Sequence, residues 1–106
     1  PMPKQIAFRM NLFPGQAAEY RKRHDEVYPE LAKALKDAGV SDYSIWHDAE
    51  SNHLFGILTL SDDNTMDKVA ELEVTKRWWA FMRDIMAADA DNVPVQIPLK
   101  RVFYLP

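Results

Sequence analysis

Apolar and polar residues alternate between positions 5 and 12, which predicts a first β-strand. The Pro14-Gly15 pair then ends this strand, because both residue types favour turns. The alternation divides the strand's side chains between two faces, with Ile6, Phe8, Met10 and Leu12 on one and Gln5, Ala7, Arg9 and Asn11 on the other.

The spacing of apolar residues becomes helical between residues 15 and 38. Gly39 is well placed as the residue that follows the helix end. Pro29 removes a backbone donor and collides with the preceding turn, so we expect a kink or a break near Val27 and Tyr28. At about 100° per residue, one third of the helix circumference carries Tyr20, His24, Val27, Tyr28, Leu31, Ala34, Leu35 and Ala38.

Two later segments are rich in aromatic and β-branched residues and predict a pair of strands, residues 42–48 and residues 53–60. The four residues between them, 49–52, are typical of a hairpin connection. The second and third strands of the domain are therefore expected to pair directly with each other.

The remainder of the chain predicts a second helical block, a loop and a last strand. The helical block is expected in two pieces, residues 66–74 and residues 75–86, with Thr75 as the cap of the second piece. Residues 87–98 contain prolines and an Asp-Asn pair and show no periodicity, which predicts a loop. Residues 100–105 predict a short final strand.

This order, β-α-β-β-α-β, predicts an α+β fold: a ferredoxin-like subunit whose antiparallel sheet is covered by helices on one face, with residues 1–106 as one domain. The third strand is apolar on both faces, since Phe55 and Ile57 oppose Leu54 and Leu58. The face without helices therefore needs a cover, and a second copy of the chain is the simplest one. We expect a two-fold homodimer whose sheets pack face to face, a dimeric α/β barrel.

Composition narrows the classes of function. The chain has 106 residues with 47% hydrophobic content, which suits one compact domain. Its 13 basic and 16 acidic side chains give a net charge of −3, so a nucleic-acid partner is not expected. Cysteine is absent, and no apolar run reaches the length of a signal peptide or membrane span. A cytoplasmic protein without membrane contact is expected.

His24 is the most informative single residue, because it falls within the apolar stripe of the predicted helix. Its neighbours Arg21, Lys22 and Arg23 fall outside the stripe and are expected to face water. Tyr20 lies four residues before His24, so their side chains can address one pocket. Two interpretations are open at this point: a core pair whose polar groups bond to the backbone, or a chemically active pair.

The Trp78-Trp79 pair favours the second interpretation, in which Tyr20 and His24 belong to a binding site. Adjacent helical residues point about 100° apart, and one small core cannot easily absorb both indoles, so one ring is expected to face a cavity. Tryptophan beside tyrosine and histidine suits a carbohydrate, whose C–H face stacks on an aromatic ring while its hydroxyls meet polar edges.

Other chemistries find little support. His24, His47, His53 and Asp48 lack the close spacing of zinc motifs, so no metal site is expected. There is no cysteine nucleophile, no glycine-flanked serine and, with three glycines, no phosphate-binding loop. Proton transfer by His24 remains, since an imidazole exchanges protons near neutral pH. Opening and closing a sugar hemiacetal needs nothing more.

Several motifs in matching order closely resemble the L-rhamnose mutarotase family. They are Tyr20-Arg-Lys-Arg-His-Asp-Glu-Val-Tyr-Pro-Glu-Leu31, Tyr43-Ser-Ile-Trp-His-Asp48, Arg77-Trp-Trp79, Asp91-Asn92 and Val102-Phe-Tyr-Leu-Pro106. The similarity spans nearly the whole chain. The resemblance implies a dimeric α/β barrel that interconverts the α and β anomers of L-rhamnose without cofactor or metal.

The resemblance also implies roles for particular residues. His24 stands at the family's proton donor, and its sugar-contacting positions are occupied by Tyr20, Tyr43, Trp78 and Trp79. The chain departs from the family at Tyr28, where relatives carry tryptophan before the proline, a change expected to affect the pocket wall.

Two other classes of function share these features. One is a cofactor-free monooxygenase of the dimeric α/β barrel superfamily, which would use the same fold and a similar histidine. The other is a noncatalytic sugar-binding dimer. Oxygen consumption with quinol-type substrates would reveal the first, and anomer exchange measured by NMR separates the mutarotase from the second.

Overall fold

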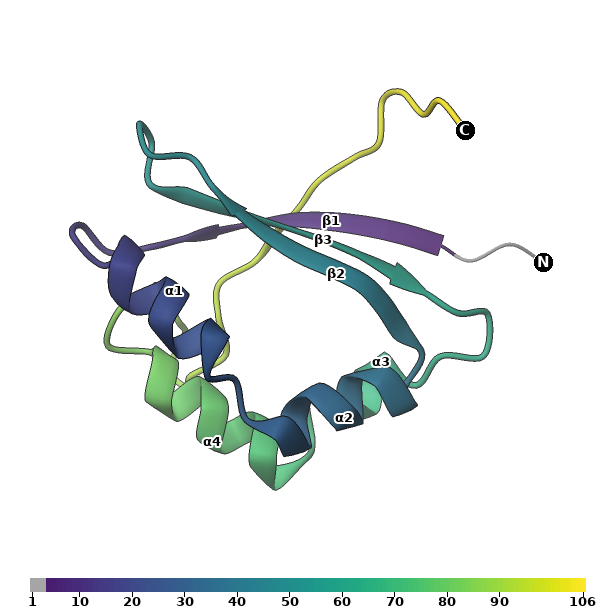
Figure 1. Cartoon of the computed structure of the whole chain (residues 1–106), viewed down its shortest axis with the longest axis horizontal. Helices are drawn as coiled ribbons and strands as arrows, with labels where there is room; N and C mark the ends of the chain where they lie inside the picture. Colours follow the sequence, from purple (N-terminus) through teal and green to yellow (C-terminus); the bar gives the residue numbers. More distant parts are fainter. Residues whose placement is uncertain (1–3) are drawn as a thin grey trace.

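The computed structural model describes residues 4–106, and residues 1–3, with which the predicted domain begins, lie outside the described residues. Its elements follow the predicted order, with each helical region in two pieces. All four helices lie on one side of an antiparallel sheet with strand order β2-β3-β1-β4 (Figure 1). The elements are β1 (Lys4–Asn11), α1 (Ala17–Asp25), α2 (Pro29–Asp37), β2 (Val40–His47), β3 (His53–Leu60), α3 (Met66–Val69), α4 (Glu73–Met82) and β4 (Ile97–Pro98).

The core lies between the sheet and the helices. Alternate residues of β1 and β3 face it, as the sequence pattern predicts, and Leu54 and Leu58 are fully buried there. Gly56 lies between them because the ring of Phe8 crosses its backbone. A Cβ at Gly56 would stand 2.6 Å from Phe8 Cε2, so β3 and β1 can pair at this point only with glycine.

The predicted helix break at Pro29 is confirmed. α1 ends at Asp25, and α2 begins at Pro29, where the missing N–H costs no helical hydrogen bond. Tyr28 has the extended backbone (φ −57°, ψ 121°) that a residue before proline prefers. α2 ends as predicted at a left-handed glycine, Gly39, with φ of 95°. The break divides the predicted apolar stripe between two helices, yet its residues Leu31, Leu35 and Ala38 still pack in or against the core. Within α1, the stripe places Tyr20 and His24 together.

The second helical block differs from the prediction in its boundaries. α3 has only four residues, and α4 runs from Glu73 to Met82 instead of from residue 75 to residue 86. Thr75 is not the cap. It is 4% exposed inside the helix, and among the described residues its hydroxyl has no hydrogen-bond partner. Leu72 is the N-cap residue of α4, because the chain leaves α3 with an extended residue at this position.

The prediction of a final strand at residues 100–105 is wrong. Only Ile97–Pro98, inside the predicted loop, pairs with β1, and the Leu99 N–H donates to the Ala7 carbonyl at 3.0 Å. Residues 100–106 then leave the sheet edge on the side away from the helices (Figure 1). Their alternation resembles a strand, but their backbone leaves the edge of β1, and Arg101 contacts that strand through its side chain, which donates to Gln5 Oε1 at 2.7 Å. Their apolar side chains, Val102, Phe103, Tyr104 and Leu105, are 94%, 77%, 57% and 79% exposed.

Within residues 4–106, none of the helices combines the length and apolarity that crossing a bilayer requires.

Candidate active site

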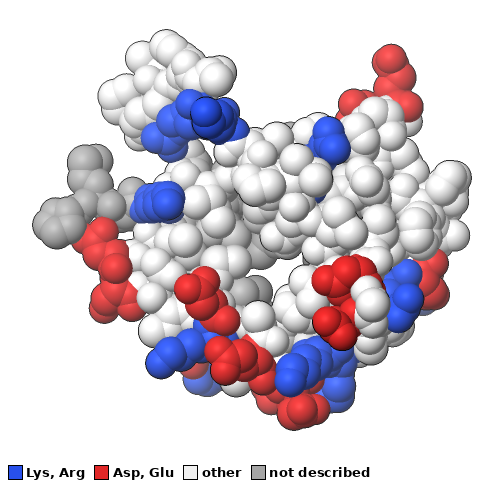
Figure 2. All heavy atoms as spheres, turned by 180° about the vertical axis from the view of Figure 1, so that it is seen from behind, with Lys and Arg blue, Asp and Glu red and all other residues white. Residues whose placement is uncertain are grey.

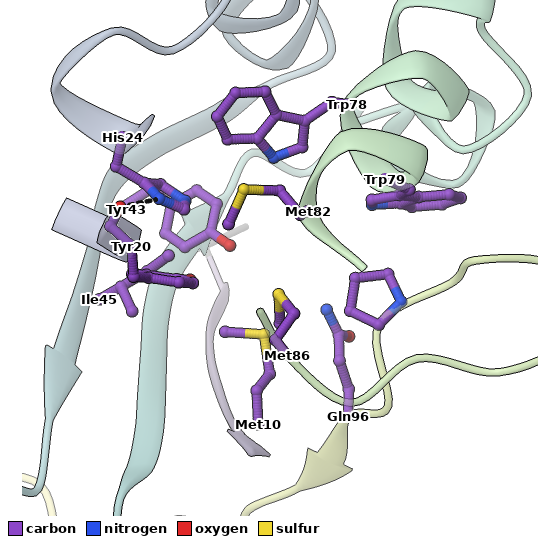
Figure 3. A pocket seen from close by; sticks show the side chains of 11 residues that line it. Met10, Tyr20, His24, Tyr43, Ile45, Trp78, Trp79, Met82, Met86 and Gln96 are labelled. Atoms are coloured by element: carbon purple, nitrogen blue, oxygen red, sulfur yellow. Dashed lines mark hydrogen bonds between the residues drawn. The ribbon is translucent and has the colours of Figure 1, made fainter. Parts of the chain in front are cut away.

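A cavity, open at its mouth, lies between the sheet and helices α1 and α4 (Figure 3). It brings together all five site residues predicted from the sequence, which come from α1, β2 and α4. The cavity is lined by Met10, Tyr20, His24, Tyr43, Ile45, Trp78, Trp79, Met82, Met86, Pro94 and Gln96.

His24 lies in the last turn of α1, half-buried in the cavity wall. Its Nδ1 is 3.1 Å from the backbone carbonyl oxygen of Tyr20. Because a carbonyl oxygen only accepts, Nδ1 carries the proton, and Nε2 of the neutral ring keeps its lone pair. Among the described residues, Nε2 has no hydrogen-bond partner. His24 thus bonds to the backbone, as expected of a core pair, yet its Nε2 remains free to exchange a proton.

Aromatic rings fix the orientation of this imidazole. The Tyr20 ring stacks on it with centroids 4.2 Å apart, and the Trp78 ring meets it edge to face at 5.3 Å. Burial among these rings lowers the pKa of His24 below its ordinary 6.5, although the hydrogen bond to the Tyr20 carbonyl opposes the change. The imidazole is therefore neutral at neutral pH.

Two phenol groups share the same side of the cavity as His24 (Figure 3). Burial raises the pKa of Tyr20 well above its ordinary 10, and the neighbouring Tyr43 adds to the effect. Burial of its hydroxyl likewise raises the pKa of Tyr43 to about 12. That hydroxyl lies deeper than the residue as a whole, which is 39% exposed. Both phenols stay protonated at neutral pH and can donate hydrogen bonds.

Tyr43 faces the cavity because of a β-bulge in β2. Val40, at the start of the strand, points into the core, and strict alternation would turn residue 43 to the opposite face. The pairing with β3 instead shifts between Ser41 and Ser44, so that β2 contains one extra residue, and Asp42 has φ of 49°. The bulge reverses the alternation and directs Tyr43 and the next inward residue, Ile45, toward the cavity.

The two tryptophans of α4 occupy different surroundings. Trp78 is 7% exposed and belongs to the core, whereas Trp79 is half-buried and packs at its edge. Both line the cavity, as the 100° between adjacent helical residues allows. Tyr28, the expected departure from the family pattern, does not line it. Its ring meets Trp78 edge to face at 5.0 Å and so supports the cavity wall from behind.

Arg23 corrects the expectation that the basic residues of α1 face water. Its side chain is 10% exposed and joins α1 to the end of α4. Its Nε donates to Glu19 at 2.8 Å, and its Nη1 donates to Asp84 at 2.8 Å and to the Phe81 carbonyl at 2.7 Å. The guanidinium lowers the pKa of Asp84. This network holds the helix of His24 against the helix of Trp78 and Trp79.

Sequence reasoning missed six lining residues. The three methionines and Ile45 follow the same apolar spacing as core residues, so periodicity cannot distinguish a cavity lining from packed interior. Pro94 and Gln96 belong to the nonperiodic segment 87–98, which gives no signal for a site. Folding brings this segment to the cavity through two backbone hydrogen bonds, from the Ala87 N–H to the Asn11 carbonyl and from the Val95 N–H to the Ala87 carbonyl.

Within residues 4–106, no three histidine or acidic side chains are placed to hold a metal ion. His47 and Asp48 instead stabilise the β2–β3 turn: Nε2 of His47 is 2.8 Å from Asn52 Oδ1, and Asp48 accepts from the Glu50 N–H and from the Ser51 hydroxyl.

The fold defines the class first: a ferredoxin-like α+β protein with an antiparallel four-stranded sheet covered by helices on one face. A solved structure of this class, a candidate antibiotic biosynthesis monooxygenase from Bacteroides thetaiotaomicron, matches with a TM-score of 0.61. The match covers 95% of this chain and 90% of that one. At 14% identity it shows a shared fold and no shared chemistry.

The chain belongs to the L-rhamnose mutarotase family. The sequence model of that family matches residues 5–105. The L-rhamnose mutarotase of Rhizobium meliloti is 56% identical over 96% of this chain and 98% of its own length. The crystal structure of an L-rhamnose mutarotase from Formosa agariphila superposes with a TM-score of 0.90 at 48% identity, covering 97% of this chain and 99% of that one. Family members of this name are isomerases.

Proposed function

We propose that this protein interconverts the α and β anomers of L-rhamnose, with His24 as the proton donor. The observation that carries the proposal is the arrangement of the cavity: a neutral imidazole with one unpaired nitrogen stands beside two protonated phenols and two indoles. Relatives of the same length that share half or more of the sequence carry this activity in their names.

The proposed reaction transfers one proton twice and breaks one carbon–oxygen bond. Nε2 of His24 removes the proton from the O1 hydroxyl, O1 becomes the aldehyde oxygen, and the C1–O5 bond breaks. The imidazolium then gives the same proton to O5, which leaves the open-chain aldehyde with a free 5-hydroxyl. Rotation about the C1–C2 bond and the reverse steps close the ring on the other face. No electrons are transferred, so we propose that the reaction needs neither cofactor nor metal.

The neighbouring aromatic residues have separate proposed roles. The hydroxyls of Tyr20 and Tyr43 donate hydrogen bonds to the sugar oxygen that gains negative charge while the proton is on His24. The rings of Trp78 and Trp79 contact the apolar face of the pyranose. The proposal also places the protein in the cytoplasm, since a chain without cysteine gains nothing from an oxidising compartment.

Exchange NMR tests the proposed activity directly. Saturating the anomeric proton of α-L-rhamnose should reduce the β signal in proportion to enzyme concentration, above the exchange seen in buffer alone. Sugar binding without such transfer would indicate the noncatalytic alternative. Oxygen uptake with a quinol substrate would indicate a monooxygenase, whereas the proposed reaction consumes no oxygen.

The pH dependence of exchange should reflect the lowered pKa of His24. The reaction begins with a neutral imidazole, and burial lowers the pKa of His24 below its ordinary 6.5. The rate should therefore fall on the acid side as His24 takes up a proton, with a midpoint below pH 6.5. Exchange NMR between pH 4.5 and pH 8.5 measures the profile, after subtraction of the exchange catalysed by the buffer. A midpoint above 6.5 would contradict a buried, neutral histidine.

We propose further that the protein is a homodimer formed through the sheet face opposite the helices. That face carries Trp46, which is 65% exposed, together with the half-buried Phe55 and Ile57. In the view of Figure 2, the charged side chains gather mainly over the helical layer, and fewer of them are seen on the side of the sheet. A second copy would cover these apolar rings.

Replacing Trp46 with lysine should disrupt this dimer. A buried interface tryptophan contributes about 2 kcal/mol or more, and two-fold symmetry counts it twice, so the Kd should rise about 1000-fold. Sedimentation across a range of protein concentrations measures the effect. Leu72→Lys is the control, because Leu72 is 41% exposed on the helical side and should leave the mass unchanged. A wild-type protein that sediments as a monomer at micromolar concentration would refute the proposed interface.

A further inference from the structure

The polar groups of the cavity are unevenly distributed. His24, Tyr20 and Tyr43 stand together on one side, and the floor is formed by methionines whose thioethers accept hydrogen bonds weakly. Across the cavity from His24, the side chain of Gln96 extends toward the same space (Figure 3). A carboxamide both donates and accepts hydrogen bonds, which none of the other side chains on that side does.

The backbone on both sides of Gln96 is fixed, whereas its side chain is not engaged. Before it, the Val95 N–H donates to the Ala87 carbonyl at 3.1 Å. After it, Ile97 pairs with Arg9 of β1. Among the described residues, the carboxamide of Gln96 has no hydrogen-bond partner, and the residue is exposed at the cavity mouth. An anchored residue with a free carboxamide is well suited to meet a ligand.

The shape of the sugar indicates which groups Gln96 would meet. In a pyranose ring, the atoms opposite O5 and C1 are C3 and C4. If O1 and O5 lie at His24, the edge that reaches the far side of the cavity carries the hydroxyls O3 and O4. In L-rhamnopyranose these two hydroxyls are adjacent and both equatorial, so one planar carboxamide can donate to one and accept from the other.

We propose that Gln96 is a substrate-binding residue that recognises the O3 and O4 hydroxyl pair and so fixes the sugar with its anomeric carbon at His24. The inference rests on the proposed role of His24 at O1 and O5. It assigns a selective function to the segment 87–98, which otherwise only closes the cavity. Epimers at C3 or C4 turn one hydroxyl away from the carboxamide and should exchange less efficiently, since a site built to bond a hydroxyl discriminates against sugars that misplace it.

The test compares Gln96→Ala with the wild-type protein on two sugars, L-rhamnose and 3,4-dideoxy-L-rhamnose, using exchange NMR over a range of sugar concentrations. With L-rhamnose, loss of two hydrogen bonds at an exposed position should raise KM about 10-fold. Because these bonds form equally in the ground state and the transition state, kcat should stay within about 2-fold and the pH profile should not move. With the dideoxy sugar, wild type and Gln96→Ala should behave alike.

Gln5→Ala is the matched control. Gln5 is an exposed glutamine whose carboxamide accepts from Arg101 at 2.7 Å on the sheet, away from the cavity, so its loss should leave KM unchanged. Thermal unfolding should confirm that both variants fold. An unchanged KM for Gln96→Ala with L-rhamnose would overturn the inference, as would an equal loss on the dideoxy sugar. A wild-type protein that exchanges neither sugar would instead overturn the proposed function, and the inference with it.

Discussion

Replacing His24 with alanine should slow the enzyme-catalysed exchange of the L-rhamnose anomers by about 10²- to 10⁴-fold, the usual contribution of one general acid–base residue. His24 performs both proton transfers in the proposed reaction, and no second histidine or carboxylate lines the cavity within the described residues. The tyrosines cannot substitute as bases, because burial raises the pKa of both phenols. Saturation transfer between the anomeric protons measures the loss in kcat, and sugar affinity should change much less.

His47→Ala is the matched control for this experiment. His47 is exposed on the β2–β3 hairpin and does not line the cavity, so the same substitution there should leave exchange at the wild-type rate. His24→Gln preserves much of the packing against Tyr20 and Trp78 and separates lost chemistry from lost structure. If His24→Ala folds and exchanges the anomers within twofold of wild type, His24 is not the proton donor.

Replacing Trp78 with alanine should lower the free energy of unfolding by about 3–5 kcal/mol, the range found when a large aromatic residue is removed from a core. Trp78 is 7% exposed and contacts His24 and Tyr28 edge to face, so its loss leaves a void behind the imidazole. Urea denaturation measures the stability. The variant should also lose anomer exchange, because His24 can then leave its position.

Trp79→Ala provides the contrast. Trp79 is half-buried at the cavity, so its removal should cost less stability and act mainly on sugar binding, raising KM more than it lowers kcat. Equal losses of stability in the two variants would mean that the indoles share one role. A Trp79→Ala protein with unchanged KM would remove Trp79 from the sugar site.

Local rules account for most of the fold. Alternation predicts β1 and β3, and the geometry of proline predicts the division of one long amphipathic segment into α1 and α2. The final strand could not be predicted, because pairing depends on which strand edge is available when the chain arrives. The same apolar residues that resemble a strand, such as Val102 and Leu105, remain exposed.

The candidate site, like the fold, could be predicted only in part from the sequence. Tyr20 and His24 are separated by one helical turn, so their proximity follows from sequence spacing alone. Trp78 and Trp79 reach them only through tertiary packing, which Arg23 helps to hold. Their adjacency predicted that one ring faces a cavity, and the family resemblance was needed to assign both to the site beside Tyr20 and His24. Gln96 could not be predicted, since it lies in a segment without periodicity whose position depends on bonds to β1 and to residue 87.

The bulge divides β2 into two parts whose inward side chains have different surroundings. Before Asp42, the even-numbered position Val40 belongs to the folding core, and after it the odd-numbered positions Tyr43 and Ile45 belong to the site. Substitutions in the first segment should therefore act mainly on stability, and substitutions in the second mainly on the cavity. Because of one inserted residue, a single strand can supply the core with one set of side chains and the cavity with another.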